Sequence, residues 1–317
     1  MKIPFFSRFI GNKNHDGWFA VCTAAHGVYL AKVKLAGAMP SVVRCEYHET
    51  GTVTAAALEK LCDDAGVGDH DFTTLLLPGE YQILLVEAPN VPAPELKTAI
   101  RWKIKDSLNY HIDEATVDVL QIPSNQHGSD RVQSMYAIAV SNDIIKKRID
   151  MFDHAGIALD VIDIPEMAQR NIAKLFEQED RALVLLAFDE SGGLLTFTSG
   201  GELYLARRIE ITVGQLLDAD DDLRAQFRDR VELELQRSLD YFDRQFNHLP
   251  VSRLMVCAPD ETRLVDFLKS VVDAKVEKLD LSQALDISAV PSLADSEFVS
   301  RVLPVLGAAL RQEVRAP

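Results

Sequence analysis

The sequence contains few cysteines and an excess of negative charge. Its four cysteines, Cys22, Cys45, Cys62 and Cys257, stand singly, without a CxxC pair or a histidine at ligand spacing. Because disulfide frameworks and zinc sites need paired or clustered ligands, we expect reduced, partly buried thiols and no bound metal. The chain has 33 basic against 48 acidic residues, a net charge of −15. This charge repels phosphate backbones, which argues against nucleic acid as a partner.

Long apolar runs are also missing. No segment approaches the roughly 20 apolar residues of a membrane span, and residues 1–17 lack the apolar core of a signal peptide. We therefore expect a cytoplasmic protein whose first 17 residues form a mobile tail. Contact of this phenylalanine-containing, basic tail with a membrane or a partner is the alternative.

Three common catalytic motifs are absent. The sequence has no GK[ST] loop, no HExxH and no GxSxG, and its eight histidines are dispersed. These absences argue against phosphate-loop, zinc-protease and nucleophile-elbow chemistry.

Two segments of the chain share one layout. The length of 317 residues exceeds the roughly 100 to 200 residues of one domain. Residues 18–35 and 183–208 each contain an apolar strand, a turn of small or polar residues, a second strand and a charged exit. This approximate duplication predicts two related α/β lobes with a ligand cleft between them.

The remaining pattern alternates strands with helices. A helix expected within 93–110 carries Leu96, Ile100, Ile104 and Leu108 as one apolar stripe, with Trp102 on its opposite face. Trp102 either packs against a second layer or contributes to a binding surface. We interpret the acidic run 218–222 as a solvated loop. We interpret the pair 207–208 (Arg-Arg) as a solvated strand exit, with an acidic partner as the alternative.

Several segments together resemble one family. They are "LKTAIRWKIKDSLNYHIDEATVDV", "YAIAVSNDIIKKRIDMFDHAGIALDVIDIPEMAQRN", "LQRSLDYF" and "LPVLGAALR". The chain is similar over nearly its whole length to the PilM-type proteins of type IV pilus biogenesis, most of all to those of the mannose-sensitive haemagglutinin (MSHA) pilus. This resemblance implies an α/β, actin-like (ribonuclease H-like) fold of two lobes.

The resemblance also implies domain boundaries. After the tail, residues 18–180 would form the first lobe, with an inserted subdomain at about 80–133. Residues 181–300 would form the second lobe, and residues 301–317 a C-terminal helix returning to the first.

The resemblance also implies that the protein acts as a scaffold at the cytoplasmic face of the inner membrane. PilM-type proteins bind the cytoplasmic N-terminal tail of a PilN-like membrane protein in a groove beside the inserted subdomain. The resemblance therefore implies a PilN-like partner, peripheral attachment through it, and other assembly components such as the assembly ATPase. Arg101, Trp102 and Lys105 are the candidate partner-binding residues. The cytoplasmic part of the secretion protein GspL is a related architecture and leaves a secretion role as an alternative.

Many relatives bind ATP between two D-x-G turns, one in each lobe. Glycine allows backbone N–H groups to approach phosphate, and the carboxylates organise the metal. In this sequence the first turn reads Cys22, Thr23, Ala24, so the carboxylate and the glycine are both missing. His26 follows in the same turn. We expect a solvated turn histidine there, with contact to an anion as the alternative.

The second D-x-G position falls on residues 187–189. Ala187 replaces the carboxylate, and Asp189 stands where glycine would approach phosphate. A shift of two residues would make Asp189 the acid, with Ser191 in the glycine position and Gly192 and Gly193 supporting the turn.

The nucleoside turn reads Cys257, Ala258, Pro259, Asp260 in place of a glycine pair, and proline has no N–H to donate. We therefore expect a degenerate nucleotide site, no cofactor and no catalysis. Weak ATP–magnesium binding, or an active actin-like ATPase or kinase, remain the alternatives.

Overall fold

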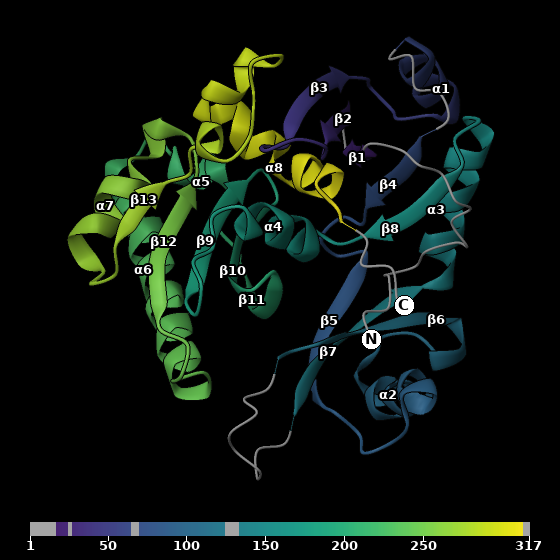
Figure 1. Cartoon of the computed structure of the whole chain (residues 1–317), viewed down its shortest axis with the longest axis horizontal. Coiled ribbons are helices and arrows are strands. Elements are labelled where there is room, and N and C mark those ends of the chain that lie inside the picture. Colours follow the sequence, from purple (N-terminus) through teal and green to yellow (C-terminus); the bar gives the residue numbers. More distant parts are fainter. Residues whose placement is uncertain (1–16, 25–26, 65–69, 124–132, 313–317) are drawn as a thin grey trace.

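Two five-stranded sheets with one common strand order dominate the computed structural model (Figure 1). The structure describes residues 17–24, 27–64, 70–123 and 133–312. The first sheet has the order β3-β2-β1-β4-β8 and the second the order β11-β10-β9-β12-β13. In each sheet an antiparallel meander is followed by two strands parallel to the first. The predicted duplication is therefore present in the strand topology.

The bounds of the strands in these sheets are as follows. The first sheet contains β1 (Trp18–Ala24), β2 (Gly27–Lys34), β3 (Ser41–Glu49), β4 (Asp71–Leu75) and β8 (Leu159–Asp163). The second contains β9 (Ala182–Asp189), β10 (Gly192–Ser199), β11 (Glu202–Ile209), β12 (Val251–Cys257) and β13 (Val276–Lys278).

A three-stranded sheet forms an insert between β4 and β8. It has the order β5-β7-β6, from β5 (Tyr81–Glu87), β6 (Ala115–Gln121) and β7 (Ser134–Ser141). Its central strand β7 lies beyond residue 133, so this sheet extends past the expected insert. One face packs on α2 (Leu96–Ile104) through Leu96, Ile100 and Ile104. The stripe ends there, because Leu108 lies beyond the helix in extended backbone and is only half-buried.

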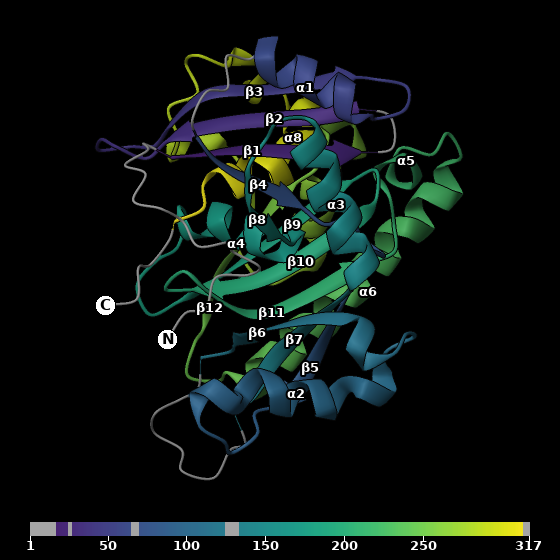
Figure 2. The same ribbon diagram turned by 90° about the vertical axis from the view of Figure 1, so that its right-hand side faces the viewer.

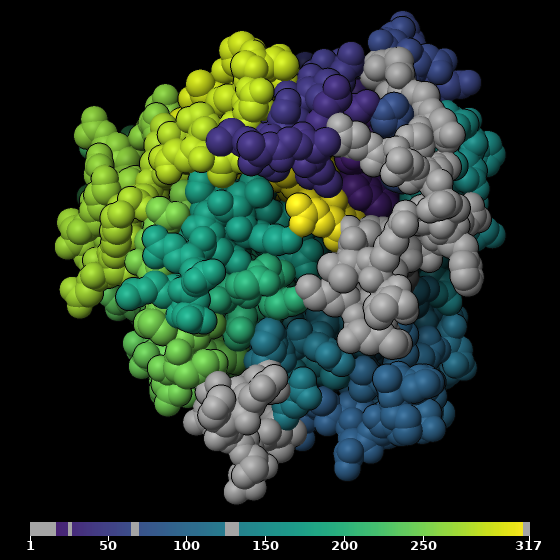
Figure 3. Space-filling model, in the orientation of Figure 1, coloured from purple at the N-terminus to yellow at the C-terminus, as the bar shows by residue number. Residues whose placement is uncertain are grey.

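The insert contacts the second lobe directly. The backbone N–H of Ala206 in β11 donates to the hydroxyl of Tyr136 in β7 at 3.2 Å. Figure 2 shows β11 running beside β6 and β7, and Figure 3 shows the blue insert lying against the green and teal surface of the second lobe. The segment expected to join β6 to β7 as a hairpin, 123–131, lies almost wholly outside the described residues.

Two helices join the lobes. α8 (Ser296–Ala309) contacts strands of both five-stranded sheets, and α4 (Pro165–Lys174) packs on α8 and on β9, β10 and β11. They approach closely at Gly307, where a Cβ atom would lie 2.2 Å from the carbonyl oxygen of Ala168. One buried apolar cluster therefore runs from the first sheet through these helices to the second.

The remaining helices cover the outer faces of the sheets. They are α1 (Ala55–Asp64), α3 (Asn142–His154), α5 (Val213–Leu216), α6 (Asp221–Gln245) and α7 (Leu264–Val271). The acidic run 218–222 is not the predicted loop throughout. Asp220 caps α6 by accepting hydrogen bonds from the N–H groups of Asp222 and Leu223, and Asp221 and Asp222 form its first turn. Carboxylates are favourable there because they face the positive end of the helix dipole. No helix in the described ranges is long and apolar enough to cross a membrane.

Candidate functional site

The positions predicted from the two D-x-G turns and the nucleoside turn lie in strands that end at the core between the lobes. Ala187 in β9 and Cys257 in β12 are direct partners in parallel neighbouring strands. Cys22 in β1 and Cys257 belong to the same buried apolar cluster, and Ala187 packs against it. The structure thus brings these three positions together around one apolar region.

The cysteines at these positions remain neutral. Burial raises the pKa of the Cys22 thiol to about 12, and burial raises that of Cys257 to about 12 as well. A nucleotide site would need carboxylates that stay charged beside a metal and its waters. Neutral thiols and a methyl group supply no such charge and no general base.

The polar atom of the first turn is already bonded within the protein. The hydroxyl of Thr23 accepts a 2.7 Å hydrogen bond from Nη1 of Arg148, whose Nη2 lies 2.6 Å from a carboxylate oxygen of Glu80. The Arg148 side chain is only 5% exposed. Ala24 ends β1, and His26 lies outside the described residues.

Sequence reasoning missed Arg148. The signal that could have found it is its position on α3, where it shares the buried face with Phe152 one turn away. A cation in an apolar row of an amphipathic helix needs a buried partner.

The second turn is held by its own side chains. Asp189 accepts from the backbone N–H of Ser191 at 2.7 Å and from its hydroxyl at 2.5 Å. Gly192 has a φ of +127°, and a Cβ atom there would lie 2.9 Å from the carbonyl oxygen of Ile209. A Cβ atom on Gly193 would lie 2.6 Å from the ring of Phe188. Packing thus accounts for both glycines without a phosphate.

The polar groups of the nucleoside turn are also bonded to other parts of the protein. Asp260 forms a 2.7 Å ion pair with Lys278, and its backbone N–H donates to the hydroxyl of Ser296 at 3.1 Å. The carbonyl oxygen of Pro259 accepts from both the backbone N–H and the hydroxyl of Thr262. Ala258 is buried. These groups bind neighbouring parts of the fold.

A buried polar cluster links the insert, α4 and the second lobe. Glu166 on α4 is 1% exposed and accepts from the hydroxyl of Tyr81 in β5 at 2.6 Å and from Arg208 in β11 at 3.1 Å. Arg208 also donates to the Tyr81 hydroxyl at 2.6 Å. Burial, followed by the charge of Glu166, raises the pKa of Tyr81 well above 10. Arg208 remains partly solvated, with 32% of its side chain exposed, but it also pairs with a buried glutamate on another element, which the interpretation as a solvated strand exit did not include.

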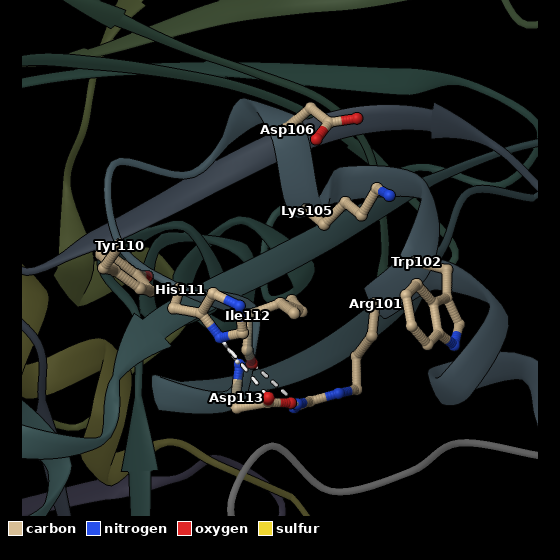
Figure 4. A pocket seen from close by; sticks show the side chains of 8 residues that line it. All are labelled: Arg101, Trp102, Lys105, Asp106, Tyr110, His111, Ile112 and Asp113. Atoms are coloured by element: carbon tan, nitrogen blue, oxygen red, sulfur yellow. Dashed lines mark hydrogen bonds and ion pairs between the residues drawn. The ribbon is translucent and has the colours of Figure 1, made fainter.

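A pocket of about 460 Å³ opens on the insert (Figure 4). Its lining comes from α2 and the segment that follows: Arg101, Trp102, Lys105, Asp106, Tyr110, His111, Ile112 and Asp113. All three candidate partner-binding residues are therefore neighbours in one pocket. Figure 4 shows Trp102 on one side of it and Tyr110 with His111 on the other.

The pocket wall combines a fixed arginine with an exposed aromatic ring. Arg101 donates 2.7 Å hydrogen bonds to the carbonyl oxygens of Ala115 and Ile112, which hold its guanidinium in place. Trp102 is 65% exposed, and the ammonium of Lys105 lies 5.7 Å from its ring centre. Core packing of Trp102 is thus wrong, because no second layer from the described ranges covers this face of α2. The hydroxyl of Tyr110 is buried and has no hydrogen-bond partner among the described residues.

Metal ligands do not gather in the described part of the chain. No group of three or more His, Cys, Asp or Glu side chains able to hold a metal ion occurs within those ranges.

Comparisons with known proteins identify the fold. No model of a protein family matches the chain, and no curated protein matches it. Among solved structures, a chain of the PilM–PilN type IV pilus biogenesis complex is 18% identical with a TM-score of 0.71, covering 94% of this chain and 98% of that one.

Two further solved structures are more distant. The cytoplasmic domain of EpsL, an inner-membrane component of the type II secretion system of Vibrio cholerae, is 11% identical with a TM-score of 0.49, covering 76% of this chain and 82% of that one. A protein of unknown function with an actin-like ATPase fold from Bacteroides thetaiotaomicron is 7% identical with a TM-score of 0.50, covering 87% and 95%. The chain therefore has the α/β actin-like fold, in the form that a chain of the PilM–PilN complex shares over nearly its full length.

Proposed function

We propose that this protein is a non-catalytic scaffold of a type IV pilus assembly machine, and that it binds the cytoplasmic N-terminal tail of a PilN-like membrane protein. The observation that carries this proposal is the likeness to a chain of the PilM–PilN complex over 94% of this chain and 98% of the other. A common fold at 18% identity does not by itself transfer a partner, so the binding site must be argued from this chain.

The insert pocket supplies that argument. Trp102 is 65% exposed, and contact between its apolar ring and water is unfavourable until a partner covers the ring. Tryptophan and arginine are also typical anchor residues of protein interfaces. Arg101 is already oriented by two carbonyl oxygens, so little conformational entropy is lost when a peptide packs beside it.

We further propose that the nucleotide site is degenerate and that the protein turns over no ATP. Three features support this: the neutral thiol of Cys22 and the methyl group of Ala187 at the carboxylate positions, the neutral, buried thiol of Cys257 in the nucleoside turn, and the internal bonds of Thr23, Asp189 and Asp260. Calorimetry with ATP and magnesium tests this part separately. Clear micromolar binding would favour the rival, an actin-like ATPase or kinase.

We also propose that the protein is an MshI-type component of an MSHA pilus. Its partner would hold it at the cytoplasmic face of the inner membrane, in contact with other assembly components, including the assembly ATPase. A GspL-like role in type II secretion is the alternative. Co-purification distinguishes the two roles: a pilus component should co-purify with the PilN-like protein, and a secretion component with the corresponding secretion protein.

The central experiment is a titration with a synthetic peptide of the PilN-like cytoplasmic tail. The chain has two tryptophans, and Trp18 is buried, so a blue shift of the emission on binding reports burial of Trp102. Trp102→Ala lacks this reporter, so calorimetry measures its affinity, which should fall by roughly 30-fold, the effect of losing a hot spot of about 2 kcal/mol. The control Leu233→Ala removes a side chain that is 46% exposed on α6, far along the chain, and should leave the affinity unchanged. No binding at high micromolar peptide would contradict the proposal.

A further inference from the structure

The strand β5 lies at an edge of the insert sheet, with one side of its backbone turned away from the sheet (Figure 1). It pairs with β7, and no strand in the described ranges pairs with its other side. Just beyond β5, the backbone N–H of Ala88 donates to Gln133 on the β7 side. Because residues of an antiparallel strand alternate between its two sides, the backbone N–H and C=O groups of Ile83, Leu85 and Glu87 point away from β7. This edge therefore presents donors and acceptors to a further strand.

Little in β5 would keep another strand away. Its sequence, YQILLVE, is rich in residues typical of strands and contains no proline or lysine, and Leu85 is 49% exposed. Other edges are protected: β13 has three residues, two of them charged, and β3 is bridged to Asp286. Lys103 of α2 donates to the carbonyl oxygen of Glu87, which protects the last residue of β5 but not its centre.

We propose that β5 is the contact surface between two copies of this chain, which pair through it as antiparallel strands around a two-fold axis at Leu84. The two insert sheets then form one continuous sheet. The register follows from the backbone, because outward residues must bond to outward residues. An axis at Leu84 pairs Ile83 with Leu85 of the second copy and Tyr81 with Glu87 of the second copy, so that the strand is matched over its full length.

The side chains complement each other in this register. Tyr81 and Ile83 pack on the side of the sheet that faces the second lobe, and Leu85 follows them on the same side. Ile83 of the second copy would cover the exposed Leu85. Glu87 of the second copy would lie opposite Tyr81, and the guanidinium carbon of Arg208 lies 5.9 Å from the centre of the Tyr81 ring. Glu87 is the one charged residue of β5, so the pairing opposes no like charges and brings a carboxylate toward an arginine.

This contact is separate from the insert pocket. Trp102 lies on the face of α2 opposite Ile100 and Ile104, which pack on the sheet. The pairing of β5 therefore does not rest on the peptide binding proposed for the pocket, and either can fail without the other.

The test is sedimentation equilibrium of the full chain over a wide range of concentrations. A contact made mainly by one strand is small, so we expect a dimer with a Kd of about 10 to 100 μM. Leu85→Lys and Ile83→Pro should each weaken it at least tenfold, since the first adds charge to the contact and the second removes an outward N–H while the bonds to β7 remain. The control Val43→Lys changes a side chain that is 38% exposed on the edge strand β3, and should alter the Kd less than twofold.

A cross-link tests the register. Residues opposite each other in a non-hydrogen-bonded antiparallel pair have Cα atoms roughly 4.5 Å apart, within the range of a disulfide. Leu84→Cys should therefore give a covalent dimer on oxidation, whereas Val86→Cys, displaced from the axis, should not. The described cysteines of the unmodified chain are buried, so that chain is the blank.

Three results would overturn the proposal. They are a monomer at every concentration, a dimer that Leu85→Lys and Ile83→Pro leave intact, and equal cross-linking of Leu84→Cys and Val86→Cys. A monomeric chain whose affinity for the PilN-like peptide is lost in Leu85→Lys would instead assign the β5 edge to a strand of that partner.

Discussion

The buried thiols at the nucleotide positions make the stability of the protein sensitive to alkali. Burial raises the pKa of Cys22 and of Cys257 from about 9 to about 12. Above pH ~9 the unfolded chain therefore loses two protons that the folded chain keeps, so the free energy of unfolding falls as the pH rises. Between about pH 8 and about pH 10, linkage gives a loss of about 3 kcal/mol for the two thiols together.

The assay is urea unfolding at these two pH values. The double variant Cys22→Ala/Cys257→Ala serves as the reference, because Cys45, Cys62 and the tyrosines contribute equally to both proteins and cancel. The unmodified chain should lose about 3 kcal/mol more than the double variant over this pH range. Both thiols should also fail to react with a disulfide reagent at pH ~9 while the protein is folded, since only the thiolate reacts.

One result would refute this reasoning. If Cys22 and Cys257 titrate near their ordinary pKa in the folded protein, water reaches both positions. The nucleotide positions would then line an open cleft, and the proposal of a closed, degenerate site would lose its main physical support.

Three other predictions concern the contacts between the lobes. Glu166→Ala should lower the free energy of unfolding by about 3 kcal/mol, the low end for breaking a buried ion pair, because Arg208 is about one-third exposed. Urea unfolding measures this loss, and a loss below ~1 kcal/mol would contradict a stabilising link between the lobes. Tyr81→Phe should cost about 2 kcal/mol through its bond to the carboxylate, and a double-mutant cycle with Glu166→Ala should show less than additive losses. Gly307→Ala should lower the melting temperature because the new Cβ atom would clash with the α4 backbone at 2.2 Å. The control Gly214→Ala has no atom nearer than 3.7 Å and should be neutral or stabilising, so equal effects at both glycines would argue against close helix packing.

Much of the fold follows from patterns within short segments. Alternating apolar residues and turn glycines predict both meanders, and the actin-like fold expected from the resemblance is confirmed. The apolar stripe Leu96, Ile100, Ile104 is buried as its period predicts. The acidic run 218–222 was predicted only in part, because a carboxylate suits a loop and a helix N-terminus equally well.

The candidate site was predictable only in part. The residue types at Cys22 and Ala187 carry no carboxylate, and this is what motivates the proposal of a degenerate site. Their partners could not be predicted, because Arg148 reaches Thr23 from a helix 125 residues further along the chain. The distance between such residues in the sequence carries no information about their distance in space.

The sequence by itself determined the local elements, the repeated lobe and the residue types in its turns, since these depend on neighbouring residues and on periodicity. Only the tertiary structure decided which faces remain uncovered. Trp102 is exposed because no element of the described part of the chain packs on its side of α2, while Arg208 is bound because α4 places Glu166 beside it. Coverage of a face depends on elements brought from elsewhere in the chain, and a single segment does not encode it.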